Sequence, residues 1–199
     1  MHPRIRLALV TVAALAAAGV LVAALSARSG GGDAAAFRGA VSPPGIPAHD
    51  FTLRDQQGRS VSLAALRGQD VILTFMYTTC RDTCPILASQ IGVALSRLAH
   101  PVPALAVSVD PRNDTPSSAR KFLIEHQVLG DVRFLLGTRA QLAPVWRAYL
   151  VSPQTSRYDH TARVFLLDRE GRQRVVYPVD QLTPDDLVHD VERMQAQGI

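Results

Sequence analysis

The sequence predicts an α/β domain in which helices flank a central mixed sheet. Two short apolar runs, Val71–Met76 and Ala104–Val109, are typical of strands that are buried on both faces of a sheet. The first is followed by Pro85–Ala99, where apolar residues recur at helical spacing. Strands that alternate with helices in this way indicate a sheet covered by helices on both faces.

The composition describes an ordinary globular chain. Its 199 residues are 47% hydrophobic and 6% aromatic, which is enough for one domain with a full core. The net charge of +4 comes largely from Arg4, Arg6 and Arg28, which flank an apolar N-terminal run. Because the rest of the chain is nearly neutral and has no basic stripe with interleaved aromatics, nucleic-acid binding is not expected.

That apolar run, Leu7–Leu25, carries no charged residue and is long enough to cross a membrane. At ~1.5 Å per residue a helix over it reaches ~28 Å, close to the ~30 Å hydrocarbon core. Since positive flanks stay in the cytoplasm, we expect a single pass through the cytoplasmic (inner) membrane, with the domain in the periplasm. A cleaved signal peptide is the alternative, because small residues occur near Ala24–Ala27.

Three parts of the chain follow from this pattern. Residues 1–28 are expected to form the membrane anchor or an uncleaved signal, and residues 29–47 a flexible linker that begins with Ser-Gly-Gly-Gly-Asp. Residues 48–199 are expected to form the folded domain.

The first elements of the domain should form an entry hairpin. Phe51–Leu53 and Ser60–Leu63 are short strand candidates on either side of the turn sequence Asp55–Gly58. The buried strand Val71–Met76 and the helix Pro85–Ala99 come next.

Threonines begin the three later helices. Thr115 and Thr183 each precede a proline, the pattern of an N-cap followed by proline at the first helical position. Thr138 with Gln141 three residues later forms a capping box. The expected helices cover 116–126 and 139–149 and begin at 184, and the expected strands are 104–109, 132–136, 162–167 and 173–177. The closing hairpin followed by a helix is typical of the thioredoxin-like fold.

The only two cysteines, Cys80 and Cys84, lie directly between the predicted buried strand and the helix that follows it. An α/β sheet offers a ligand site at this place, where a helix N-terminus stabilises a thiolate. The C-x-x-x-C spacing puts both sulfurs on one side of a helical turn. A structural disulfide is the alternative in an exported protein, although a bridge that closes so short a loop removes little chain entropy.

His160 is the third candidate, because it directly precedes the predicted strand 162–167. In a thioredoxin topology this segment passes close to the cysteine loop. Taken alone, a histidine here would more often be a satisfied surface or core residue. Two thiolates and one imidazole form a soft set that suits copper better than calcium or magnesium, whereas zinc would normally want a fourth ligand.

Three aspartates near the cysteines each have two interpretations. Asp82 either tunes the thiols or contacts a partner, or else it serves the following helix as its N-cap or first-turn acid. Asp110 and Asp114 either line the rim of the site or serve turn formation and capping.

Taken together, the chain from about Phe51 to its C-terminus resembles the Sco/SenC family of copper-binding assembly factors for cytochrome c oxidase. The combination of C-x-x-x-C with a downstream Asp-His is the specific part of this resemblance. In the family the loop usually reads Cys-Pro-Asp-x-Cys, and Arg81 stands here in place of the proline, where its charge should favour thiolate. The matching segments are Leu73–Cys80, Cys84–Pro85, Val107–Pro111, Asp114–Pro116 and Asp159–Thr161.

The resemblance implies a thioredoxin fold and one copper ion per domain, held by Cys80, Cys84 and His160. It implies a metallochaperone, rather than an enzyme, that delivers copper to the CuA centre in the copper-bearing subunit of the oxidase. An upstream periplasmic copper chaperone is a further expected partner. The alternative is an exported thiol–disulfide oxidoreductase that keeps the oxidase cysteines reduced and needs both cysteines but not His160. A peroxidase, the third class on this scaffold, has no matching motif here.

Overall fold

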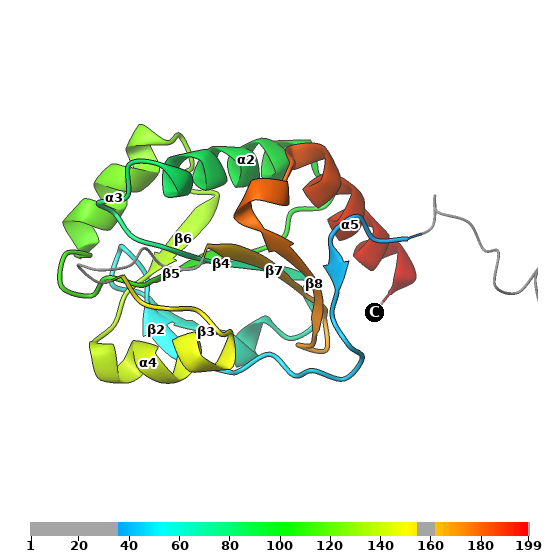
Figure 1. The fold of residues 1–199 in the computed structure, drawn as a ribbon, viewed down its shortest axis with the longest axis horizontal. Helices are drawn as coiled ribbons and strands as arrows, with labels where there is room; N and C mark the ends of the chain where they lie inside the picture. Colours follow the sequence, from blue (N-terminus) through cyan, green and yellow to red (C-terminus); the bar gives the residue numbers. More distant parts are fainter. Residues whose placement is uncertain (1–35, 155–161, 199) are drawn as a thin grey trace, which may run out of the picture. The chain divides into compact units, whose positions relative to one another are not determined.

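The computed structural model describes residues 36–154 and 162–198 (Figure 1). The chain divides into two compact units, Met1–Ala36 and Phe37–Ile199, and the following description concerns the second. The membrane helix predicted over Leu7–Leu25 lies outside the described residues. Within the described ranges, no helix has the length and apolar character needed to cross a membrane.

A six-stranded mixed sheet forms the centre of the domain, in the order β1-β8-β7-β4-β5-β6. Strands β4, β5 and β6 run parallel to one another, whereas β7 pairs antiparallel with β4, and β8 pairs antiparallel with β7 and β1. The predicted central mixed sheet is therefore confirmed. The strands are β1 (Ala40–Val41), β4 (Val71–Met76), β5 (Ala104–Ser108), β6 (Val132–Leu135), β7 (Arg163–Leu167) and β8 (Gln173–Pro178). The predicted entry hairpin is a separate sheet of β2 (Thr52–Arg54) and β3 (Ser60–Ser62).

Helices cover both faces of the sheet. In Figure 1, α2 and α3 lie above the sheet and α4 below it, and α2 packs against α5. The predicted caps of the later helices are present, since Thr115, Thr138 and Thr183 each accept a backbone N–H from the third residue that follows. The helices are α2 (Thr83–Arg97), α3 (Pro116–Glu125), α4 (Arg139–Ala148) and α5 (Pro184–Gln197), with short 3-10 turns η2 (Ala64–Leu66) and η3 (Val179–Gln181) that the sequence analysis did not predict.

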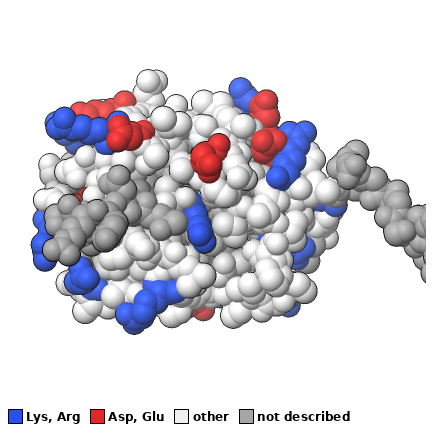
Figure 2. All heavy atoms as spheres, viewed as in Figure 1, with Lys and Arg blue, Asp and Glu red and all other residues white. Residues whose placement is uncertain are grey.

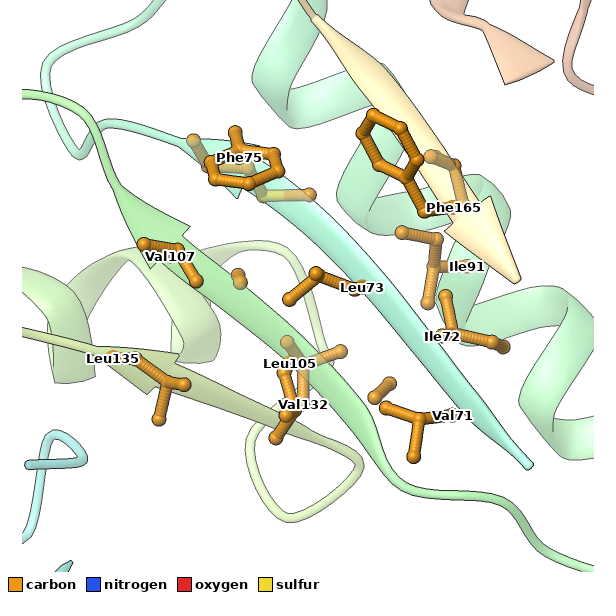
Figure 3. Packing of buried hydrophobic residues seen from close by; sticks show 14 of the residues in the cluster. Val71, Ile72, Leu73, Phe75, Ile91, Leu105, Val107, Val132, Leu135 and Phe165 are labelled. Atoms are coloured by element: carbon orange, nitrogen blue, oxygen red, sulfur yellow. The ribbon is translucent and has the colours of Figure 1, made fainter. Parts of the chain in front are cut away.

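The core is built around β4, in which every residue is buried. Leu73 and Phe75 are 0% exposed, and Figure 3 shows Leu73 near Leu105 of β5, with Ile91 of α2 beside Ile72; Phe75 packs against Phe165 of β7. Each such side chain contributes ~1.5–3 kcal/mol when it is fully buried. The strand that leads to the cysteines is therefore held firmly on both faces.

The segment before β2 also belongs to the folded unit. Ala40 and Val41 pair with Val176 and Val175 of β8, and the buried carboxylate of Asp190 accepts the backbone N–H groups of residues 38 and 39 at 2.9 Å each. The folded unit therefore includes residues 37–47, which the sequence analysis assigned to the flexible linker. The partners of this segment, β8 and Asp190 of the last helix, lie far away in the sequence, so the local Pro-rich sequence did not indicate these contacts.

Candidate functional site

The two cysteines lie where the sequence places them, at the carboxyl end of β4 and in the first turn of α2. Both are free thiols and both are buried, Cys80 with 8% of its surface exposed and Cys84 with 0%. The Sγ atom of Cys80 accepts the backbone N–H of Cys84 at 3.3 Å, and Thr83 Oγ1 lies 3.7 Å from the same sulfur. Asp82 is at the N-cap position of α2, but its side chain makes no capping hydrogen bond. The sulfur of Cys80 accepts a helix N–H group in its place.

Hydrogen bonding makes the two thiols unequal. The Cys84 thiol donates to the Cys80 sulfur, and together with the backbone N–H groups of Cys84 and Asp82 this lowers the pKa of Cys80 to about 4 despite its burial. The same bond, together with burial, raises the pKa of Cys84. Arg81, whose charge was expected to favour thiolate, is not among the main causes. The pair is best described as one thiolate that receives a hydrogen bond from one thiol.

Asp114 holds the loop that carries Cys80. Its Oδ1 atom accepts both the backbone N–H and the hydroxyl of Thr78, each at 2.8 Å. Its Oδ2 atom accepts the hydroxyl of Ser108 at 2.5 Å, at the end of β5. Of the two interpretations left open for Asp114, the structure favours a contact with the site, because Thr115 and not Asp114 caps α3. Sequence reasoning had no signal for its partner, which lies 36 positions earlier.

Asp110 serves the turn after β5. Its Oδ2 atom accepts the side-chain N–H of Asn113 at 2.7 Å, and its backbone carbonyl accepts the N–H groups of Asn113 and Asp114. The turn interpretation of Asp110 is therefore the one that the contacts support. Asp114, together with Pro111 and Pro116, lines an open pocket of about 560 Å³ beside the β2–β3 hairpin.

His160 lies outside the described residues, but both of its flanks are described. The backbone N–H of Gln154 donates to Val109 O at 3.0 Å, just beyond the end of β5. On the other side, Arg163 O accepts the hydroxyl of Thr74 at 2.9 Å, where β7 begins beside the second half of β4. Both flanks thus lie toward the carboxyl edge of β4 and β5. Among the residues that the structure describes, no three His, Cys, Asp or Glu side chains are grouped to hold a metal ion.

One face of the molecule carries scattered charged side chains. Figure 2 shows acidic and basic side chains interspersed over the visible face, separated by wide uncharged areas. Over the described part of that face no continuous basic stripe is visible.

Comparison with known proteins identifies the family. The SCO1/SenC family profile matches residues 42–196, most of the chain. The chain belongs to the SCO1/SenC family. Its C-x-x-x-C loop after β4 and its mixed sheet are consistent with this membership.

Two sequence relatives illustrate how far the likeness of this SCO1/SenC chain extends. The SCO1 protein homolog of Bacillus subtilis is 27% identical over 153 residues, which cover 71% of this chain and 79% of that protein. The mitochondrial SCO2 homolog of Bos taurus is 31% identical over 137 residues, covering 61% of this chain and 50% of that protein. The matched region therefore spans only half of the bovine protein.

Solved structures of Sco proteins have the same fold as this SCO1/SenC chain. The copper-bound ScoI of Bradyrhizobium japonicum has a TM-score of 0.63 and 31% identity, covering 74% of this chain and 98% of that one. BsSco, a member of the Sco family of cytochrome c oxidase assembly proteins, has a TM-score of 0.68 at 23% identity, covering 78% of this chain and 97% of that one. The predicted thioredoxin-like architecture is thus confirmed.

Proposed function

We propose that this chain is a copper chaperone that delivers one copper ion to the CuA centre of a cytochrome c oxidase during its assembly. The observation that carries the proposal is the pair of adjacent sulfurs at the carboxyl end of β4, with Cys80 held as thiolate by hydrogen bonds. Thiolate is the form of cysteine that binds soft metals. The copper-bound ScoI of B. japonicum supports copper as the cargo.

The donor set fits copper when His160 is included. Arg163 follows His160 by three positions, and a chain spans at most ~3.6 Å per residue, so their Cα atoms lie within about 11 Å of each other. Arg163 in turn is hydrogen-bonded to Thr74 of β4, the strand that leads to Cys80. This connectivity supports His160 as the third ligand, beside Cys80 and Cys84.

Unequal burial suggests how the cargo enters and leaves. Cys80 is 8% exposed whereas Cys84 is 0% exposed, so an incoming ligand reaches the Cys80 side of the pair first. Ligand exchange with an upstream donor chaperone, and then with the copper-bearing subunit, would proceed from that side. Loading also requires Cys84 to lose its proton, because only deprotonated thiols bind the metal.

The inequality of the two thiols favours a second function, thiol–disulfide exchange with the oxidase cysteines. The Cys80 thiolate attacks a partner disulfide, forming a mixed disulfide and releasing one partner thiolate. Cys84 then loses its proton to solvent and attacks Cys80 Sγ, which releases the second partner thiol and leaves a Cys80–Cys84 disulfide. Two electrons pass to the partner. Cys84 is freed for this step because the main cause of its raised pKa, the bond to Cys80, is lost in the mixed disulfide.

For the location we propose a single-pass anchor over Leu7–Leu25 in the cytoplasmic membrane, with the domain in the periplasm. The uncharged length of that run and the arginines before it support this. Alkaline carbonate extraction of membranes separates an uncleaved anchor, which stays in the pellet, from a cleaved leader, which releases the domain.

Metal analysis tests the copper proposal. The purified reduced chain, titrated with Cu(I) beside a chelator of known affinity, should bind one equivalent, and Cys80→Ala and Cys84→Ala should abolish this binding. His160→Ala should weaken it at least tenfold, whereas His100→Ala, an exposed histidine on the loop after α2, should match the wild type. Wild-type protein that binds no copper would refute the chaperone.

A partner assay separates the two functions. The copper-bearing subunit is supplied either reduced and copper-free, or oxidised at its cysteines. A chaperone transfers copper to the reduced subunit, and His160→Ala abolishes this transfer. An oxidoreductase reduces the oxidised subunit, and His160→Ala reduces it at the wild-type rate.

A further inference from the structure

We propose that Asp114 is a positioning residue that holds the Cys80–Cys84 loop in its dithiol form. The inference rests on the proposed function, because it assumes that the two cysteines are the working groups. It assigns the task of keeping them ready to a side chain on a different loop, between β5 and α3.

The carboxylate of Asp114 is fully occupied by the cysteine loop and the end of β5. It is 7% exposed, and its contacts are all with donors: the N–H and hydroxyl of Thr78, and the hydroxyl of Ser108. Buried polar atoms left without such partners are strongly disfavoured. The arrangement therefore favours a single position of Thr78.

Thr78 follows Tyr77, whose backbone forms hydrogen bonds with both cysteines. The carbonyl of Tyr77 accepts the N–H of Cys80 at 3.3 Å, which forms the turn that carries the thiolate. The backbone of Tyr77 also hydrogen-bonds to Cys84, which favours its ionised form. The Thr78 N–H and the Tyr77 carbonyl belong to one peptide unit, so holding Thr78 also holds the acceptor of the Cys80 N–H.

The other end of the restraint is anchored in the core. Ser108 is 0% exposed and ends β5, and its carbonyl accepts the indole N–H of Trp146 at 2.9 Å. The backbone N–H of Asp114 is itself bonded to Asp110 O at 2.9 Å. The loop is thus fastened to a rigid point.

Turn formation and helix capping do not account for the contacts of Asp114, because other residues perform both tasks. Asp110 closes the turn with Asn113, and Thr115 caps α3 with its own side chain. Asp110 is as buried as Asp114, at 7% exposed, but no contact of its side chain with the cysteine loop is among the described interactions. Asp110→Asn is therefore a matched control for Asp114→Asn.

The test is the dithiol–disulfide equilibrium of the metal-free chain in glutathione buffers. A dithiol stabilised by positioned donors resists oxidation, so releasing the loop should favour the disulfide. We expect Asp114→Ala to shift the equilibrium toward the disulfide by about tenfold. Asp114→Asn, which keeps an oxygen for Thr78, should stay within about twofold of the wild type, as should Asp110→Asn.

A pure charge effect predicts the opposite sign. Removing a negative charge near a thiolate stabilises the reduced form, so both Asp114→Ala and Asp114→Asn would then shift toward the dithiol. That result, or a folded Asp114→Ala with the wild-type equilibrium, overturns the proposal. If Asp114→Ala does not fold, Thr78→Val removes the hydroxyl contacts with Asp114 and Ser118 but keeps the backbone N–H bond to Asp114, and it should shift the equilibrium in the same direction, by less. An unshifted Thr78→Val would then refute positioning.

The copper titration described above is a separate measurement. Wild-type protein that fails to bind copper refutes the chaperone without touching the role of Asp114. A wild type that binds copper while Asp114→Ala keeps the wild-type equilibrium refutes only the positioning role.

Discussion

Two buried aspartates use the same chemistry in different settings. Asp114 accepts one backbone N–H and two hydroxyls, whereas Asp190 accepts two backbone N–H groups and one hydroxyl. Asp190, 0% exposed in α5, fastens the segment before β1, whereas Asp114 fastens the loop of the two cysteines. A buried carboxylate therefore does not by itself mark a working site, and the groups that it holds decide its role.

The space around the two networks also differs. A Cβ added at Gly39, beside Asp190, would lie 2.4 Å from Val175 Cγ1 and 2.7 Å from Tyr177 Cζ. Asp114 instead borders an open pocket of about 560 Å³. The contacts of Asp190 with Arg38, Gly39 and Tyr177, which we call the clasp, lie in tightly packed surroundings. The Asp114 network instead reaches a surface that a ligand or partner can approach.

The largest expected contrast concerns reactivity at the site. With a pKa lowered to about 4, Cys80 should remain thiolate from pH 8 to pH 5, so its alkylation rate should change little in that range. Below pH 4 the rate should fall about tenfold per pH unit, because the thiolate fraction falls by that factor. Iodoacetamide labelling of Cys84→Ser, which keeps a hydroxyl donor for Cys80, measures the profile. A rate that already falls tenfold per unit between pH 8 and 6 would contradict it.

The clasp should matter chiefly for stability. Asp190→Ala leaves two backbone N–H groups without their acceptor and leaves the Tyr177 hydroxyl only the carbonyl of Asp186, which should lower the free energy of unfolding by about 3 kcal/mol. Urea unfolding followed by circular dichroism measures the loss. The dithiol–disulfide equilibrium of the same variant should match the wild type. A shift in that equilibrium would break the distinction between clasp and site.

Overpacking tests the close approach at Gly39. Gly39→Ala forces Val175 or Tyr177 to move and should cost about 1–3 kcal/mol. Gly58→Ala is an instructive comparison, because nothing lies within 4 Å of its added Cβ and only its positive φ of 78° opposes the side chain. Because Gly39 has no positive φ, a Gly39→Ala variant as stable as the wild type would contradict the packing argument.

The smallest effect should come from the surface of the clasp. Arg38 and Asp186 form an ion pair at 2.9 Å whose side chains are 49% and 27% exposed. Solvent screens such pairs, so Arg38→Ala should change the free energy of unfolding by less than about 1 kcal/mol. A loss as large as that of Asp190→Ala would mean that the side chain of Arg38, and not its backbone N–H, carries the clasp.

Local rules account for what could be predicted. The buried run Val71–Met76 coincides with β4, and Thr115, Thr138 and Thr183 cap helices as expected, because these signals lie within a few residues of the structure they specify. The place of Cys80 and Cys84 followed from the same strand–helix pattern.

Long-range hydrogen bonds account for what could not be predicted. Asp114 contacts Thr78, which lies 36 positions earlier, and Asp190 contacts the N–H of Arg38, which lies 152 positions earlier. Neither partner leaves a periodic or compositional trace in the sequence. Arg81 shows the same limit for charge, since hydrogen-bond geometry, and not its proximity in sequence, sets the ionisation of Cys80. His160 remains a prediction, because it lies outside the described residues.

The position of Trp146 gives the protein an intrinsic optical probe. It is the only tryptophan of the chain, and its indole donates to the carbonyl of Ser108, whose hydroxyl binds Asp114. Indole emission responds to changes in the polarity and hydrogen bonding of its surroundings. Cargo loading or oxidation at the cysteines could therefore be followed in real time by ultraviolet fluorescence, without a label.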